Sequence, residues 1–217
     1  MRSKDNVMIF PGAEGWPFPK YLGSCGWLIV TISTKPLKSF YGASSDVAAD
    51  LALQLLAVLE SMKSNDLNYF FYFTRVDAGM FGVFSDGHLF IRDASTLGVI
   101  DKQEGSQWMD GQQEEKDIFS SLVIDNQSVL PPCNSIKHTQ SLSMVCAELL
   151  SKLLKGTFLP PVQKKIDSAL NICADSSLTT QEIAMAAQEL VEILKPLRTC
   201  DSHFAYRYPD CKYSVRL

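Results

Sequence analysis

The stretch Phe71-Tyr-Phe-Thr-Arg-Val-Asp-Ala-Gly-Met-Phe-Gly-Val-Phe-Ser-Asp-Gly-His-Leu-Phe-Ile-Arg-Asp93 decides the fold of this chain. Its centre, Ser85-Asp-Gly87, separates two short apolar runs, and the Asp-Gly pair accepts the positive φ values that a tight turn requires. The stretch therefore predicts a β-hairpin between residues 81–84 and 88–92. Asp93 follows the second strand directly, so we expect its carboxyl group just past a strand end.

Outside this stretch the sequence predicts an α+β fold with a large helical part. Trp27–Ser33 is β-branched and apolar throughout, which predicts a buried strand. Apolar residues at helical spacing predict a core helix over 45–64, capped by Ser45. Further helices are expected towards the carboxyl terminus, and the last of them begins with a capping box, Thr179-Thr-Gln-Glu182. They span roughly 141–155, 162–173 and 180–195.

The predicted organisation is one domain with irregular ends. Residues 1–26 are rich in glycine and proline, which indicates an irregular lead-in. The domain occupies 27–195 and includes a long polar loop at 101–133. A cysteine-containing tail follows at 196–217.

The composition argues against two classes of partner. The chain has 24 acidic and 20 basic residues and a net charge of −4. Nucleic-acid binding that depends on phosphate contacts requires a basic surface, so we expect no nucleic-acid partner. No apolar run reaches the roughly 18 to 20 residues that cross a bilayer, so we expect no membrane span.

Six scattered cysteines are more than a cytosolic chain of this size usually carries. The absence of a Cys-x-x-Cys pair disfavours zinc and favours disulfides in an oxidising compartment. Buried free thiols in a cytosolic protein are the alternative. Asn126-Gln-Ser128 adds a glycosylation sequon at Asn126. All six cysteines are disulfide candidates, and they permit 15 pairings: Cys25, Cys133, Cys146, Cys173, Cys200 and Cys211.

The amino terminus does not match an exported protein. No apolar stretch of signal length follows Met1 before Pro11. Either the protein is cytosolic and this is its true start, or the chain is a fragment or a short isoform. We favour the second interpretation.

Three segments together resemble the divergent protein kinase domain family, and most closely the branch named for deleted in autism and its related protein. They are the 69–101 block, Gly15-Trp-Pro-Phe-Pro-Lys-Tyr-Leu-Gly-Ser-Cys-Gly26 and Asp50-Leu-Ala-Leu-Gln-Leu-Leu56. The resemblance implies a protein-kinase-like fold in the secretory pathway, so the protein would be secreted or reside in the Golgi lumen. Only 26 residues precede the Trp27 strand, so we expect mainly the helical large lobe, with the small lobe largely missing.

The resemblance also implies roles for residues of the hairpin block. Family members with an intact loop carry a catalytic aspartate, four intervening residues, then a metal-binding asparagine and a phenylalanine. Aligning Phe81 with that phenylalanine puts Arg75 at the aspartate and Met80 at the asparagine. An arginine cannot accept a proton, and a thioether is a poor ligand for magnesium.

A second alignment would use Asp77 as the base, and it then puts Gly82 at the asparagine position. Glycine has no side-chain ligand, so the metal pair fails in both alignments. Asp93 matches the family's metal-binding aspartate, or is an ordinary loop carboxylate. We expect Arg75 to pair with Asp93 and to fill the magnesium position with a fixed cation.

These observations predict a secretory-pathway pseudokinase-like protein that acts by binding another protein, without phosphoryl transfer and without a cofactor. The partner itself is not identifiable from the sequence. The alternative is an active atypical kinase or nucleotidyl transferase, using ATP and Mg²⁺, whose small lobe belongs to a longer isoform. A degraded product without function is a third option.

Overall fold

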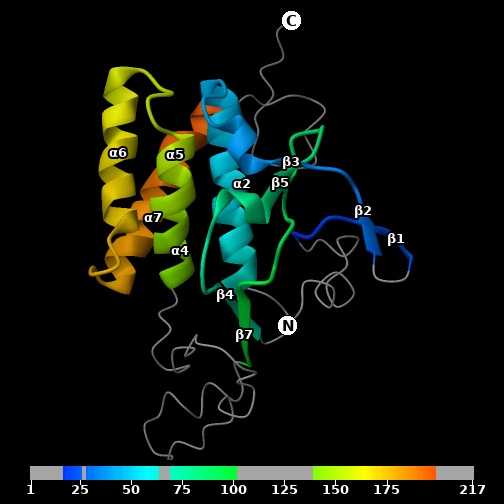
Figure 1. Ribbon diagram of the computed structural model, residues 1–217. Coiled ribbons are helices and arrows are strands. Elements are labelled where there is room, and N and C mark those ends of the chain that lie inside the picture. Colours follow the sequence, from blue (N-terminus) through cyan, green and yellow to red (C-terminus); the bar gives the residue numbers. More distant parts are fainter. Residues whose placement is uncertain (1–16, 26–27, 64–68, 102–138, 199–217) are drawn as a thin grey trace, which may run out of the picture.

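The computed structural model describes residues 17–25, 28–63, 69–101 and 139–198, and within them it shows a mixed helix and strand architecture (Figure 1). Helices gather on one side and short antiparallel strand pairs on the other. The strands are paired as follows: β1 (Tyr21–Cys25) with β2 (Leu28–Thr31), β3 (Lys35–Pro36) with β5 (Phe81–Val83) and β5 with β6 (Leu89–Ile91), and β4 (Tyr69–Phe73) with β7 (Leu97–Asp101).

The central element is α2 (Ser45–Lys63), which confirms the predicted core helix almost to the residue. It lies between the helical layer and the strands (Figure 1). A helix covered on more than one side is apolar around most of its circumference. The buried residues of α2 follow this rule: Ala48, Ala49, Leu51, Ala52, Leu53, Leu55, Leu56, Val58 and Met62.

The predicted hairpin is also confirmed. β5 and β6 pair antiparallel with Phe81 opposite Ile91 and Val83 opposite Leu89. Gly87 has a φ of 83°, a value that favours glycine. The N–H of Gly87 donates to Phe84 O at 3.0 Å and closes the turn. The Asp-Gly pair therefore lies in the tight turn that the sequence predicts.

The helical layer forms where the sequence predicts it. The first predicted helix is α4 (Gln140–Val145) continued by a π-helical turn, Cys146–Leu150, and by α5 (Ser151–Leu153). The others are α6 (Pro160–Ala174) and α7 (Thr180–Leu194), followed by a 3-10 turn, Lys195–Leu197. The capping box is present, because Thr179 Oγ1 accepts from the N–H of Glu182 and the Glu182 carboxylate accepts from the N–H of Thr179.

The amino-terminal prediction needs two corrections. The expected irregular lead-in contains β1, and the expected buried strand is exposed: β2 pairs with β1 in a ribbon away from the helices (Figure 1), with Leu28 70% exposed and Val30 47% exposed. An apolar, β-branched run predicts a strand, but burial requires a second layer over it. A further strand, β7, lies where no strand was predicted.

Among the helices of the described ranges, none combines the length and apolarity that crossing a membrane requires.

Candidate functional site

The kinase-like segment comprises two loops, 74–80 and 92–96, which follow β4 and β6. Pairing of Phe73 with Leu97 brings the loops side by side. Thr96 then ties them together: its carbonyl accepts from the N–H and hydroxyl of Thr74 at 2.9 and 3.0 Å, and its own hydroxyl donates to Arg75 O at 2.9 Å. The backbone of both loops is therefore fixed by local hydrogen bonds.

Met80 and Asp93 are brought together by the backbone. The carbonyl of Met80 accepts from the N–H of Arg92 at 2.7 Å and from the N–H of Asp93 at 3.2 Å. The positions that the resemblance assigns to the two metal ligands are thus adjacent. The Met80 side chain is 2% exposed, and its sulfur lies 3.4 Å from the backbone nitrogen of Asp77 and 3.5 Å from Thr96 Oγ1.

Arg75 pairs with Asp77, and the expected contact between Arg75 and Asp93 is wrong. Arg75 Nη2 lies 3.7 Å from Asp77 Oδ2, and both side chains are largely exposed. The Asp93 carboxylate instead accepts from the N–H of Ser95 at 2.9 Å. Asp77 lies two residues from Arg75 in the same loop, so the pair forms locally, and an exposed ion pair of this kind contributes about 0–1 kcal/mol.

The alignment that uses Asp77 as a base meets a steric obstacle. Asp77 caps the 3-10 turn Ala78–Met80 by accepting from the N–H of Gly79 at 2.8 Å. Gly82, which this alignment puts at the metal-ligand position, is packed against two side chains. A Cβ there would lie 2.3 Å from Thr34 Oγ1 and 2.5 Å from Arg92 Cδ, so there is no space for a ligand side chain.

The donor set decides what these loops can do chemically. Magnesium prefers oxygen ligands in octahedral geometry. Asp93 supplies a carboxylate, but the adjacent position supplies the buried thioether of Met80. In the described parts of the chain no group of three histidine, cysteine, aspartate or glutamate side chains could hold a metal ion.

Comparison with known proteins identifies the family of the chain. The family model described as the protein-kinase domain of FAM69 matches residues 6–176. The chain belongs to the divergent protein kinase domain family. It is similar to Divergent protein kinase domain 2B of Homo sapiens, with 64% identity over 208 residues, which are 96% of this chain and 48% of that protein.

Other members of the divergent protein kinase domain family match over the same extent. Divergent protein kinase domain 2B of Mus musculus is 61% identical over 97% of this chain and 48% of its own length. Divergent protein kinase domain 2A of Homo sapiens is 31% identical over 88% of this chain and 48% of its own length. The chain thus spans about half the length of the curated relatives it matches. No solved structure matches the chain.

Sequence reasoning missed a cluster of ionisable side chains beside loop 74–80. Its members are Tyr41, Asp77, Glu148 and Lys152. The hydroxyl of Tyr41 is buried and has no hydrogen-bond partner among the described residues. Burial raises the pKa of Tyr41, the ammonium of Lys152 lowers it, and the carboxylates of Glu148 and Asp77 raise it further. Lys152 and Glu148 themselves form an ion pair at 2.9 Å. No local sequence pattern marks Tyr41, because the cluster joins segments distant in sequence.

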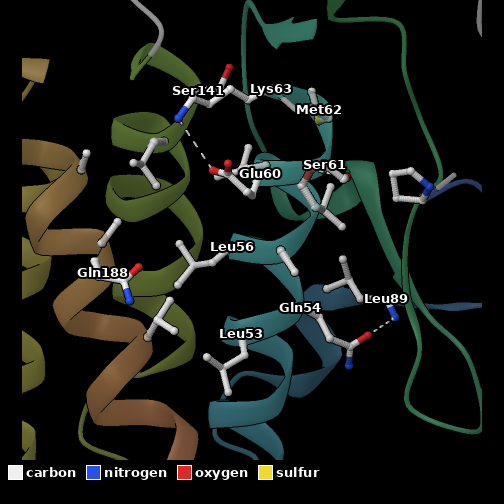
Figure 2. Close-up of a pocket in the computed structure, with 18 of the residues that line it drawn as sticks. Leu53, Gln54, Leu56, Glu60, Ser61, Met62, Lys63, Leu89, Ser141 and Gln188 are labelled. Carbon is white, nitrogen blue, oxygen red and sulfur yellow. Dashed lines mark hydrogen bonds and ion pairs between the residues drawn. The ribbon is translucent and has the colours of Figure 1, made fainter. Parts of the chain in front are cut away.

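Sequence reasoning also missed Gln54, which binds the hairpin to α2. Its side-chain oxygen accepts from the N–H of Leu89 at 2.9 Å, and its amide nitrogen donates to Gly87 O at 2.8 Å and to Asp50 Oδ2 at 2.9 Å. Figure 2 shows Gln54 reaching Leu89 from the strand side of α2, while Leu56 lies on the side nearer α7. A glutamine inside an apolar helix is the signal that was available.

The pocket in Figure 2 has a volume of about 1010 Å³ and lies between α2, α4 and α7. None of Arg75, Asp77, Met80 and Asp93 lines it. Its ionisable lining residues are Glu60, Lys63, His88, Lys195 and Arg198. This pocket is therefore separate from the candidate site in the kinase-like segment.

The structure contains one of the disulfides that the sequence allowed. Cys146 in the π-helical turn is bonded to Cys173 near the end of α6, with 5.9 Å between their Cα atoms. Cys25 is exposed and has no disulfide partner within the described ranges. The other cysteine candidates and the sequon lie outside the described residues: Cys133, Cys200, Cys211 and Asn126.

Proposed function

We propose that this chain is part of a pseudokinase-like protein that works by binding another protein. The observation that supports the proposal is the pairing of Met80 with Asp93 through the Met80 carbonyl. The backbone brings together the two residues that the resemblance assigns to the family's metal ligands, and one of them offers sulfur in place of oxygen. Without the second oxygen, an Mg²⁺ ion bridging the phosphates of ATP loses a ligand that phosphoryl transfer requires.

The position of the catalytic base supports the same proposal. An arginine side chain cannot take a proton from an attacking hydroxyl, and the resemblance assigns the position of the base to Arg75. Its exposed guanidinium pairs with Asp77, whose carboxylate is also bound to the Gly79 N–H. On this proposal Asp77 serves the loop structure, and Arg75 leaves the position of the catalytic aspartate without a base.

We propose that the protein works in the secretory pathway. Disulfides persist in oxidising compartments and are rare in the cytosol. The Cys146–Cys173 bond closes a loop across buried positions of the helical layer, since both cysteines are 0% exposed.

An active kinase or nucleotidyl transferase is the second candidate, because Asp93 offers a carboxylate at a position that the resemblance assigns to a metal ligand and the relatives are about twice as long as this chain. The remaining parts of a longer protein would have to supply the missing ligand and base. Nucleotide binding separates the two candidates.

The experiment is a thermal unfolding series on the 217-residue chain with ATP alone, Mg²⁺ alone and both together. A ligand that binds only the folded state raises the melting temperature. We expect no magnesium-dependent shift in the wild-type chain or in Asp93→Ala, and no transfer of labelled γ-phosphate to a general protein acceptor. A shift in wild type that Asp93→Ala abolishes would favour the active enzyme.

A further inference from the structure

A second pocket, of about 840 Å³, lies beside the hairpin turn. Three parts of the chain line it: the extended segment 32–35, the start of α2 together with Phe40, and hairpin residues 83–87. We call it the hairpin groove. The candidate site residues Arg75, Asp77, Met80 and Asp93 do not line the groove, so it is separate from the site described above.

The groove combines an apolar base with acidic sides. Leu51 and Val83, each 1% exposed, are its most buried lining side chains. Phe40 and Val47 are partly buried beside them. Burial of an aliphatic side chain is the usual source of affinity in a pocket of this size.

The charged lining residues have an excess of negative charge. Asp46, Asp50 and Asp86 carry three negative charges against the one positive charge of Lys35. Asp46 and Asp50 are four residues apart in α2, so they lie on the same face of the helix. Asp86 approaches from the hairpin turn, where its carboxylate accepts from the N–H of His88 at 3.0 Å and contacts the imidazole Nδ1 at 2.9 Å.

The walls of the groove are fixed relative to one another. Pairing of β3 with β5 places Lys35 opposite Val83. On the other side, Gln54 bonds to Asp50, Gly87 and the N–H of Leu89, which fixes the turn against α2. A groove that is already formed does not lose conformational entropy when a ligand enters.

We propose that the hairpin groove binds an extended basic segment of a partner protein. Its arginine or lysine side chains contact the carboxylates of Asp46, Asp50 and Asp86, and a neighbouring apolar side chain packs against Phe40 and Val47, above Leu51 and Val83. The charge complementarity selects a basic ligand and disfavours a phosphate-bearing one, and the apolar base distinguishes a peptide from a simple cation. This inference rests on the proposed function in protein binding and names the surface that performs it.

The test measures fluorescence anisotropy of a labelled peptide, Arg-Lys-Arg-Gly-Leu-Gly-Leu, against the full 217-residue chain. We expect saturable binding that weakens about five- to tenfold in Asp46→Asn/Asp50→Asn, which removes two charges and keeps the shape of both side chains. The matched control is Asp167→Asn/Asp175→Asn, which makes the same change on and just after α6 and should bind as wild type does. Raised salt should weaken wild-type binding more than binding to the groove variant.

Two peptide controls separate charge from apolar contact. A peptide with glutamate in place of the basic residues should not bind, and one with serine in place of leucine should bind more weakly. Equal binding by the groove variant and wild type would overturn the proposal. A dimer of the chain that Asp46→Asn/Asp50→Asn dissociates would also overturn it, in favour of a second copy as occupant. The probe is added without nucleotide or metal ion, so this outcome is independent of the ATP experiment.

Discussion

The two loops at the kinase-like segment and the helical layer are stabilised in different ways. Loops 74–80 and 92–96 are fixed by hydrogen bonds centred on Thr96 and on the Met80 carbonyl. The layer of α4, α6 and α7 is fixed by apolar packing and by the Cys146–Cys173 disulfide. A buried bond from the N–H of Phe73, the last residue of β4 before the first loop, to Ser141 Oγ at 2.8 Å links the two regions.

The difference shows which parts of the fold depend on side-chain identity. Backbone bonds such as Asp93 N–H to Met80 O form with any non-proline residue, so the loop geometry survives exchange of the side chains that chemistry requires. Packing in the helical layer depends on the side chains themselves. The kinase-like segment can therefore keep its shape after losing its chemistry, whereas the helical layer cannot lose its side chains without losing stability.

The largest expected effect concerns the disulfide of the helical layer. We expect Cys146→Ala/Cys173→Ala to lower the free energy of unfolding by about 3–4 kcal/mol, because the bond closes a loop with a sequence separation of 27 residues. Chemical denaturation in the absence of reductant measures it. Cys25→Ser, at an exposed cysteine that has no disulfide partner within the described ranges, is the control and should match wild type. Equal stability of the double variant and wild type would show that the layer does not depend on this bond.

A smaller effect is expected at Gly82 in β5, where the packing beside the loops leaves no room for a side chain. A Cβ at this position meets Thr34 and Arg92 at 2.3 and 2.5 Å. We expect Gly82→Ala to lower the free energy of unfolding by about 1–3 kcal/mol through overpacking. Gly23→Ala in β1 is the control, since a Cβ there has no atom within 4 Å. If both variants unfold alike, Gly82 is not packed as described.

The smallest expected effect is a pH dependence at the start of α7. Hydrogen bonds from the hydroxyl and then from the N–H of Thr179 lower the pKa of the Glu182 carboxyl. A lowered folded-state pKa contributes stability above the unfolded value, and this contribution is lost as the pH falls through the folded value. Glu182→Gln should therefore be less stable than wild type at neutral pH, and the difference should shrink under acid conditions.

Urea denaturation at neutral and acidic pH checks this expectation. Glu189→Gln, on the same helix, removes a carboxyl without a capping role and should show no such convergence. A Glu182→Gln difference that stays constant with pH would contradict the capping role.

Sequence was sufficient where structure depends on neighbouring residues. The Asp-Gly turn, the extent of α2 and the capping box at Thr179 are set by contacts within a few positions, and all three are confirmed. The resemblance assigned positions 80 and 93 to the two metal ligands, and the Met80 carbonyl brings these positions together. The pairing of Cys146 with Cys173 was one of the combinations that the sequence left open.

Sequence was insufficient where the outcome depends on distant segments or on competing partners. The burial of β2 required a covering layer that an apolar pattern cannot specify. Two carboxylates, those of Asp77 and Asp93, were candidate partners for Arg75. The structure pairs Arg75 with Asp77, which is only two residues away in the sequence. Gln54 bonds to a turn 33 residues later; a glutamine inside an apolar helix marks the residue as unusual but does not identify this partner.

The most direct test of the central claim is to restore the lost chemistry on the kept backbone. Arg75→Asp/Met80→Asn supplies the base and an oxygen ligand beside Asp93, and circular dichroism with Met80→Leu as a control establishes that position 80 tolerates exchange. By titration calorimetry we expect the wild-type chain to show no Mg²⁺ binding and the restored variant to bind Mg²⁺ in an Asp93-dependent way. Binding by wild type that Asp93→Ala removes, or a folded restored variant that binds no more than wild type, would contradict the account.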